Sequence, residues 1–344
     1  MHLFEKKRIL ILILFIVFSF TLESCSNSDD EQLKVRIACF PNLNHSQALV
    51  GMGEGQFQEA FGEKNQIEWK IFNAGPAEME ALFAGEVDIG YIGPIPAING
   101  YVKSGGEFQI IAGATDAGAI LVSRKDLHIK DIMELDGKKI ASPQFGNTQD
   151  LVLRHILNEN GLKDTTKGGS VRIIQVENPD IKMLLDNADI DAALVPEPWG
   201  SRLIKEIDAN VVLDYDQVYN QGRYSSALVI ARTEFIEKHP DLVKKFIETH
   251  LQLTEYINEN NDTVKKVLND QIKKLTNNSI PDDILDASFE RFVITNNPEK
   301  ESISDFIKIS KDVGFIEQEP DIEMLLNTNI LNDVLKESGK SEIK

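Results

Sequence analysis

The sequence predicts an α/β protein built from two lobes, and three observations lead to this fold class. At 344 residues with 42% hydrophobic content, the chain exceeds one small core and fits two α/β domains. Strand-like and helix-like apolar spacings alternate along residues 33–231, which is typical of parallel sheets covered by helices. The segment LFAGEVDIGYIGP at 82–94 also recurs, in degenerate form, as LDNADIDAALVPE at 185–197.

This short repeat has two explanations. Any protein made of βαβ units repeats a helix, an acidic turn and a buried strand, so the alignment alone leaves that explanation open. Both copies, however, end in proline-bearing turns, GPIP at 93–96 and PEPW at 196–199. Two similar lobes with facing turns make a cleft, so we expect a ligand to bind between the lobes.

The charge balance narrows the classes of partner. A formal net charge of −19 argues against nucleic acid and against an anionic bilayer as electrostatic partners. It does not exclude a small anion, because a bound anion responds to nearby helix N–H groups more than to surface carboxylates screened beyond about 8 Å.

The amino terminus predicts export and anchoring. KKR at 6–8 precedes the apolar run ILILILFIVFSF at 9–20, as in a signal peptide. The following Leu-Glu-Ser-Cys resembles the bacterial lipoprotein box, which implies a lipoprotein signal peptide at 1–24, acylation of Cys25 and a tether at 25–32. An uncleaved anchor is the alternative, although this run is short for a span that needs about 20 residues. Either way the body is expected outside the cytoplasm, anchored on the periplasmic side or the cell surface.

Cysteine and histidine usage predicts neither a disulfide scaffold nor a metal site. Cys25 and Cys39 are the only cysteines, so lipidation of Cys25 leaves Cys39 as a buried thiol. The chain has no CxxC or HExxH motif, and its six histidines show no ligand spacing. We therefore expect no metal and no cofactor.

The first lobe begins with strands at 33–40 and 67–72, and the helix between them is expected to be capped by Asn44 or Ser46. A buried strand at 87–92 follows, and its carboxyl end lies where open parallel sheets bind ligands.

Two residues bound the short helix before that strand: Pro76 suits a first helical position, and Gly85 suits the residue after a helix end. Further strands at 108–112 and 119–123 flank the loop 113–118, whose small residues can approach a ligand closely. An ordinary hairpin turn is the alternative for this loop.

The second lobe follows a change in composition after Arg124. A strand at 139–143 leads to a helix capped by Asn147 or Thr148, with Asp150 in its first turn. Strands and helices then alternate, which predicts another parallel sheet.

The strand SSALVIA at 225–231 echoes AILVS at 119–123 and is expected to return the chain to the first lobe. Amphipathic helices follow at 240–259, 262–275, 282–292 and 302–313, and they form a helical C-terminal extension around lobe one. The predicted boundaries are lobe 1 at 33–124 plus 222–344 and lobe 2 at 125–221.

Catalytic motifs are missing from the sequence. GxGxxG, GxxxxGK[ST] and GxSxG do not occur. Asp191 and Glu197 form a possible carboxylate pair, but the turn position of Asp191 is better explained by capping. We therefore expect a protein that is not an enzyme.

Several segments together resemble a known family: FPNLNHSQALVG, FNAGPAEMEALFAGEVDIGYIGPIPAI, GAILVSRKD, DIMELDGKKIASPQFGNTQDLVLRHIL and DAALVPEPWGSRLI. They look like the nitrate, taurine and aliphatic-sulfonate group of ABC-transporter solute-binding proteins, in order from about Val35 to His250. The resemblance implies a two-lobed fold of the periplasmic-binding-protein type, class II. It also implies a hinged, monomeric receptor that closes on an oxyanion-bearing solute and delivers it to an ABC permease and its ATPase. Thiamine-precursor (pyrimidine) binding proteins and biosynthetic enzymes share this superfamily and form the alternative, although an exported lipoprotein is a poor place for such an enzyme.

Carried over by matching segment, the resemblance implies a ligand pocket formed by Asn44, His45, Gly93, Pro94, Thr115, Gly118, Asn147, Thr148, Glu197 and Trp199. Helix starts would donate N–H groups to an anionic head, and Trp199 would supply an apolar wall. Taken alone, His45 is equally well explained as a helix-cap or surface histidine. Glu197 is expected to pair with a ligand amine, as in taurine, or with Arg223. We favour a small sulfonate-like anion or zwitterion with an organic tail.

Overall fold

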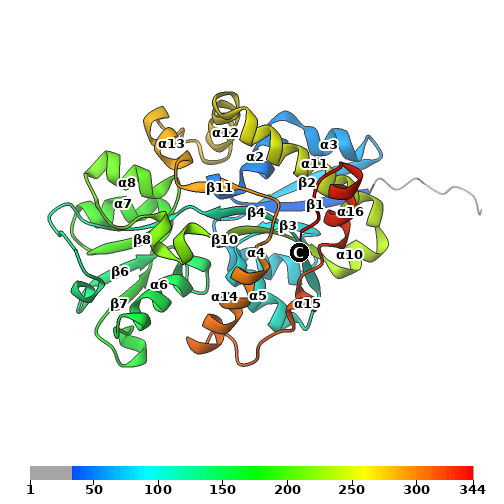
Figure 1. Ribbon diagram of the computed structural model, residues 1–344. Coiled ribbons are helices and arrows are strands. Elements are labelled where there is room, and N and C mark those ends of the chain that lie inside the picture. Colours follow the sequence, from blue (N-terminus) through cyan, green and yellow to red (C-terminus); the bar gives the residue numbers. More distant parts are fainter. Residues whose placement is uncertain (1–32, 344) are drawn as a thin grey trace, which may run out of the picture.

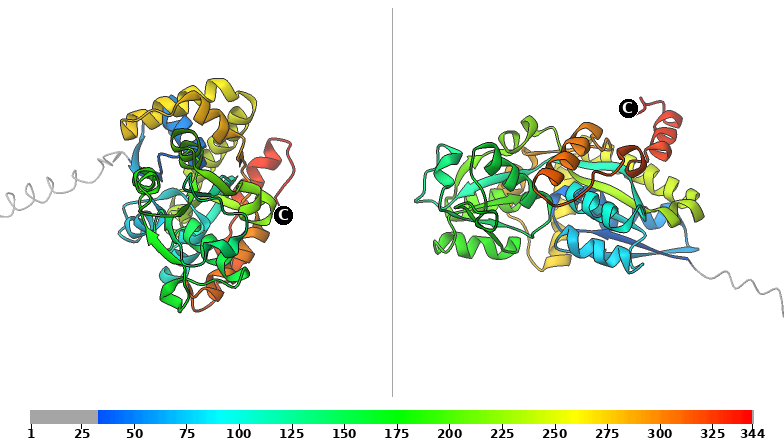
Figure 2. Two further views of the ribbon diagram at one scale, coloured as in Figure 1. Left: turned by 90° about the vertical axis from the view of Figure 1, so that its left-hand side faces the viewer. Right: turned by 90° about the horizontal axis from the view of Figure 1, so that it is seen from below.

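The structure is a computed structural model that describes residues 33–343. The predicted signal peptide at 1–24 and the tether at 25–32, including Cys25, lie outside the described residues. Figure 1 shows two groups of strands flanked by helices, which we name the first lobe and the second lobe. Both the start of the described chain and its end lie on the first lobe (Figures 1 and 2). None of the helices in residues 33–343 combines the length and hydropathy that a membrane span requires.

The first lobe contains a six-stranded sheet in the order β11-β4-β10-β3-β1-β2. β1 pairs in parallel with β2 and β3, whereas β10 runs antiparallel to β3 and β4, and β11 runs antiparallel to β4. The strands are β1 (Leu33–Cys39), β2 (Asn65–Ile71), β3 (Ile89–Ile92), β4 (Phe108–Ala117), β10 (Ser225–Arg232) and β11 (Phe292–Ile294).

The second lobe contains a five-stranded sheet in the order β7-β6-β8-β5-β9. β6 pairs in parallel with β7 and β8, and β5 runs antiparallel to β8 and β9. The strands are β5 (Ala119–Ser123), β6 (Lys139–Ser142), β7 (Arg172–Gln175), β8 (Ala192–Pro196) and β9 (Asn210–Leu213).

The observed strands and helices differ from four predictions made from the sequence. Both sheets are mixed rather than mainly parallel, because β10 and β5 run opposite to their neighbours. The expected loop 113–118 is largely strand, since β4 continues to Ala117 against β10. Strand 119–123, expected in lobe one, pairs within the second sheet, so the crossover lies near Gly118 instead of residue 124. The expected helix at 282–292 ends early, because β11 adds an edge strand to the first sheet.

Helices cover both sheets, and Figure 1 labels them in chain order. In the described chain they are α2 (Ser46–Glu54), α3 (Gln56–Phe61), α4 (Gly75–Phe83), α5 (Pro94–Ser104), α6 (Thr148–Glu159), α7 (Asn178–Asp186), α8 (Trp199–Ile207), α9 (Tyr215–Val218), α10 (Thr233–Lys238), α11 (Pro240–Glu259), α12 (Asn261–Thr276), α13 (Asp282–Phe289), α14 (Lys300–Asp312), α15 (Ile322–Leu325) and α16 (Asn329–Glu337). Short 3₁₀ turns lie at Leu43–His45, Ile132–Leu135, Thr165–Lys167 and Asn220–Gly222.

The C-terminal helices pack against both lobes. α11 packs on α2, α3 and α16 in the first lobe, as the sequence predicts. α13, in contrast, packs on α8 of the second lobe, and α14 contacts both α5 and α6. The C-terminal extension therefore touches the second lobe as well as lobe one.

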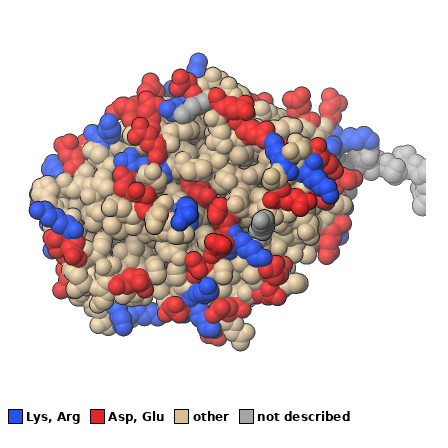
Figure 3. Space-filling model, viewed as in Figure 1, with Lys and Arg blue, Asp and Glu red and all other residues tan. Residues whose placement is uncertain are grey.

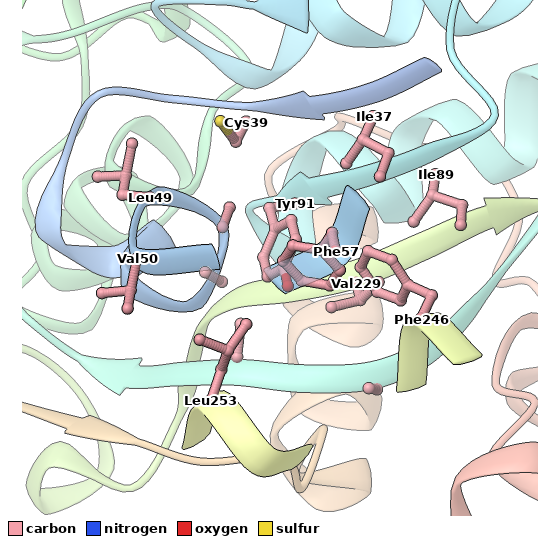
Figure 4. Close-up of a cluster of buried hydrophobic side chains, with 14 of the residues drawn as sticks. Ile37, Cys39, Leu49, Val50, Phe57, Ile89, Tyr91, Val229, Phe246 and Leu253 are labelled. Carbon is pink, nitrogen blue, oxygen red and sulfur yellow. The ribbon is translucent and has the colours of Figure 1, made fainter. Parts of the chain in front are cut away.

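The core of the first lobe lies between the sheet and α2, α3 and α11 (Figure 4). Phe57 stacks on Phe246, with ring centroids 4.9 Å apart. The hydroxyl of Tyr91 lies 2.8 Å from Nδ1 of His250, whose Nε2 lies 2.8 Å from the carbonyl oxygen of Gly113. This buried histidine is a satisfied core residue, which explains how α11 is held against the sheet.

Charged side chains remain on the surface. Asp and Glu are interspersed with Lys and Arg over the face shown in Figure 3. The acidic excess of the chain is therefore not confined to one patch of this face.

Candidate functional site

A cavity of about 40 Å³ lies between the two lobes. From the first lobe it is lined by Phe40, Asn42, Asn44, His45, Asn73, Ala74, Gly75, Gly93, Pro96 and Ser226. From the second lobe it is lined by Pro143, Asn147, Thr148, Gln149, Asn178 and Pro196. We name this space the inner cavity. None of these lining residues carries a formally charged side chain.

Several helices begin at the inner cavity. His45, Ala74, Gly93 and Asn147 are the N-cap residues of α2, α4, α5 and α6, and Asn178 is the first residue of α7. The first N–H groups of a helix have no partner within the helix, and they carry the positive end of its dipole. The helix dipoles therefore make the wall electropositive although its side chains are neutral. The first turns of α4, α5 and α7 contain prolines, which carry no N–H, so these helices offer fewer free donors than α6.

Asn44 is fixed by hydrogen bonds within the first lobe. Its Nδ2 donates to Ser226 Oγ at 2.8 Å, and Thr115 Oγ1 donates to the Asn44 carbonyl at 2.7 Å. Ser226 Oγ in turn donates to the Thr115 carbonyl at 3.1 Å. These bonds use Thr115 to hold Asn44 in place, and they leave Asn44 Oδ1 buried without a partner among the described residues.

His45 is buried and neutral. Its Nδ1 accepts a hydrogen bond from the Phe40 N–H at 3.2 Å, so the ring proton is on Nε2. Burial lowers the pKa of His45 to about 3. The expectation that Asn44 or Ser46 caps this helix was wrong, because α2 begins after His45, which makes no side-chain cap bond, and the preceding 3₁₀ turn is capped by Asn42.

Asn147 and Thr148 bring the second lobe to the same cavity. Asn147 Oδ1 accepts from the Asp150 N–H at 2.8 Å, which confirms the predicted N-cap. The Thr148 hydroxyl is buried and has no partner within residues 33–343. It approaches Gly93 so closely that a Cβ at residue 93 would lie 2.5 Å from Thr148 Oγ1. Only a glycine at this position lets the lobes meet as they do.

The predicted pocket is therefore partly assembled. Asn44, His45, Gly93, Asn147 and Thr148 line the inner cavity. Pro94, Thr115, Gly118 and Glu197 do not line it, and Trp199 lines the outer groove described below.

Eleven of the sixteen lining residues were not predicted, and among them Asn73, Asn178 and Ser226 lie near the end of β2, at the start of α7 and near the start of β10. The predicted lining residues were carried over from the family resemblance, and position at a strand end or a helix start is the local signal that agrees with it. The same signal was available for Asn73, which closes β2.

Glu197 has a structural role. It is fully buried and accepts from the Ser201 N–H and hydroxyl, each at 2.9 Å, and from Ser288 Oγ at 3.2 Å. The Arg291 guanidinium lies 3.6 Å away. Burial raises the pKa of Glu197, while these partners oppose the shift. The expected pairing with Arg223 was wrong, because Arg291 after α13 supplies the cation. The pairing with a ligand amine stays a prediction.

A second space, which we name the outer groove, lies beside the inner cavity and has a volume of about 950 Å³. Its walls include Trp199, over whose ring the Arg202 guanidinium lies at 5.3 Å. Asn42, Asn73 and Asn178 line both spaces, so the two lie next to each other.

Known proteins are similar to this chain in sequence. A protein of Bacillus subtilis (strain 168) that is named for binding aliphatic sulfonates is 29% identical over 301 residues, which are 81% of this chain and 87% of that protein. The taurine-binding periplasmic protein of Escherichia coli (strain K12) is 30% identical over 203 residues, 59% of this chain and 60% of that protein.

Solved structures show the same fold. The alkanesulfonate-binding protein SsuA from Xanthomonas axonopodis pv. citri superposes with a TM-score of 0.70 at 16% identity, covering 86% of this chain and 97% of that one. The nitrate-binding protein NrtA from Synechocystis PCC 6803 gives 0.74 at 15% identity, covering 89% of both chains. The two-lobed periplasmic-binding-protein fold is thus confirmed. The family model described as NMT1-like matches residues 28–269, and this chain therefore belongs to the NMT1-like family.

Proposed function

We propose that this protein is the solute-binding receptor of an ABC importer, and that its inner cavity binds the oxyanion of a small sulfonate-like solute. The observation that carries this proposal is the convergence of helix starts on a cavity without charged side chains. The names of the relatives, which refer to sulfonates and taurine, support the same class of ligand.

The cavity suits a weakly basic oxyanion. Each helix start contributes about 0.3–1 kcal/mol toward a nearby anion. The Thr148 hydroxyl and the Nε2–H of His45 add neutral donors. Phosphate and nucleotides are usually held by bidentate arginines, and no arginine lines this cavity. The unpartnered Oδ1 atoms of Asn44 and Asn178 suit a ligand that also carries a donor, such as the ammonium of taurine.

The approach of Thr148 to Gly93 supports closure on the solute. These residues come from different lobes, and their contact leaves little space around the inner cavity. A solute that reaches this cavity needs the lobes to separate and then close again, which is the hinge motion of two-lobed receptors.

The cellular part of the proposal rests on the sequence and the relatives. A lipid at Cys25 would anchor the protein outside the cytoplasm, and the solute would pass to a permease and its ATPase from a monomeric receptor. Replacing Cys25 with serine should abolish fatty-acid labelling and release the protein from membranes. Unchanged labelling would exclude this anchor.

Binding without catalysis is the function that we propose, and the alternative is a thiamine-precursor binding protein or a biosynthetic enzyme. Among the described residues, no carboxylate lines the inner cavity to recognise a pyrimidine amine or to act as an acid or base. The uncharged lining of the inner cavity therefore favours an oxyanion over a pyrimidine as the ligand.

A ligand panel tests the proposal on protein that lacks residues 1–25. Alkanesulfonates, taurine, nitrate and pyrimidine precursors are compared by thermal shift and calorimetry. A true ligand at a hundred times its dissociation constant stabilises the fold by about 2.7 kcal/mol. Thr148→Ala should then weaken the best oxyanion by about 1.5–3 kcal/mol, whereas Thr165→Ala, at an exposed threonine of the same lobe, should not. Binding of a pyrimidine alone, or turnover of any solute, would refute the proposal.

A further inference from the structure

α13 lies between α12 of the first lobe and α8 of the second (Figure 1), and it is attached to the first lobe by apolar packing. Its side chains Ile284 and Leu285 belong to the core of the first lobe and are 1% and 3% exposed. On the same side, Lys265 of α12 pairs with Asp286 at 2.6 Å. Burial of two aliphatic side chains removes apolar surface from water, so we expect α13 to move with the first lobe.

The contact of α13 with the second lobe is polar instead. Ser288 Oγ donates to the Glu197 carboxylate at 3.2 Å. Just after the helix, Arg291 donates to Asp214 at 2.9 Å and to Ser201 Oγ at 3.0 Å. The apolar cluster of the second lobe that includes α8 contains no described residue of α13. Interfaces between domains that move are more polar than permanent ones, so this contact is the one that can separate.

Both sides of this contact keep partners of their own when the lobes separate. Glu197 accepts from the Ser201 N–H and hydroxyl within the second lobe, each at 2.9 Å. Arg291 donates to the Ala287 carbonyl at 3.1 Å, and its side chain is 17% exposed, so water reaches it. A buried charge that lost every partner would make separation very costly, and these internal bonds reduce that cost.

The polar contact also adjoins the crossover between the lobes and the inner cavity. The Gly118 N–H donates to the Arg291 carbonyl at 3.0 Å, and the Gly118 carbonyl accepts from the Glu197 N–H at 2.8 Å. Pro196, the residue before Glu197, lines the inner cavity. A rotation of the lobes about the crossover therefore changes the distance between Arg291 and its partners in the second lobe.

We propose that α13 is a latch, which moves with the first lobe and holds the second lobe closed through Ser288 and the adjacent Arg291. The latch sets the ratio of closed to open receptor, and with it how tightly and for how long a solute is retained. This inference rests on the proposed function, because it takes closure of the lobes around a solute as the motion that the latch controls.

The test compares two latch variants with two controls, all lacking residues 1–25. Arg291→Lys keeps a cation but loses the planar guanidinium that reaches two partners, so the closed-to-open ratio should fall about 10- to 100-fold. Ser288→Ala removes one bond and should lower this ratio about 2- to 10-fold. The controls are Arg232→Lys, whose arginine pairs with Glu234 within the first lobe, and Ser310→Ala, whose hydroxyl is buried in α14 without a partner among the described residues.

Small-angle scattering measures the radius of gyration of the ligand-free proteins, and calorimetry measures their affinity for methanesulfonate. If the ligand-free parent is mostly closed, the latch variants should expand; if it is mostly open, their dissociation constant for methanesulfonate should rise by the same factors. Either change, absent from both controls, supports the latch. Unchanged scattering together with unchanged affinity in both latch variants would overturn it. If no solute of the ligand panel binds the parent, the proposed function fails, and the ligand-free scattering alone decides the latch.

Discussion

Gly93→Ala should block ligand-bound closure without harming the fold of the first lobe. The backbone at Gly93 has φ −69° and ψ 152°, which alanine adopts without strain. The added Cβ would lie 3.7 Å from Pro96 and from the Ser226 carbonyl, an ordinary contact distance within the first lobe. Across the cleft, however, it would lie 2.5 Å from Thr148 Oγ1. The clash therefore acts between the lobes.

The magnitude follows from this geometry. Forcing an extra methyl group into a close contact costs about 1–3 kcal/mol, which corresponds to a loss of affinity of roughly 5- to 150-fold. Thr148→Ala removes the clashing oxygen, so the double variant should bind no more weakly than Thr148→Ala alone. Calorimetry on the four proteins of this double-mutant cycle measures the coupling.

Thermal melting of the ligand-free proteins provides the control, since Gly93→Ala alone should melt within a degree or two of the parent if the lobes can separate. Wild-type affinity in Gly93→Ala would refute the reasoning. So would independent, additive losses in the double variant.

Three further predictions concern the buried charges and the cavity. Arg291→Ala should cost roughly 3–5 kcal/mol of unfolding free energy in urea denaturation, because Glu197 would lose its buried cation; Arg223→Ala is the comparison and should cost far less. Burial raises the pKa of Asp116 from 3.8 to about 7, so its contribution to stability is fully present below pH 3.8 and is lost as pH rises through 7. Asp116→Asn should therefore have a larger free energy of unfolding than the parent at pH 8, by on the order of 1.4 kcal/mol per unit of pKa shift. If the difference in unfolding free energy between variant and parent is the same at pH 4 and pH 8, the burial of this carboxyl is contradicted. Burial lowers the pKa of His45 to about 3, so calorimetry should show no change in ligand affinity caused by this ring between pH 5 and pH 8. A change in affinity near pH 6.5 that disappears in a His45 variant would show that the ring ionises in this range.

Local signals in the sequence identified many elements correctly. The Asn147 cap, the left-handed Gly85 with φ 74° and the helix at 240–259 follow from rules that act within a few residues. Five of the ten predicted pocket residues line the inner cavity, whereas eleven of its sixteen lining residues were not predicted, although strand ends and helix starts are visible in the sequence.

The remaining features depend on partners far along the chain. AILVS and SSALVIA look alike locally, yet β5 pairs in the second sheet and β10 in the first. Residue 113 is a glycine in a position where the backbone of Asn297 crosses too close for a Cβ, and a segment such as GATDA without alternation looks like a loop. Glu197 finds its cation 94 positions later, at Arg291. No local pattern predicts such pairings.

The neutral inner cavity within an acidic protein has a kinetic consequence. Helix ends attract an anion only within a few ångströms, whereas the net charge of −19 repels it out to about the Debye length. An arriving anion is therefore repelled at long range and attracted only after it enters the cleft. Added salt should speed capture and leave the dissociation rate nearly constant, which is the reverse of the behaviour of electrostatically steered pairs. Such a receptor retains its solute by slow release rather than by fast encounter.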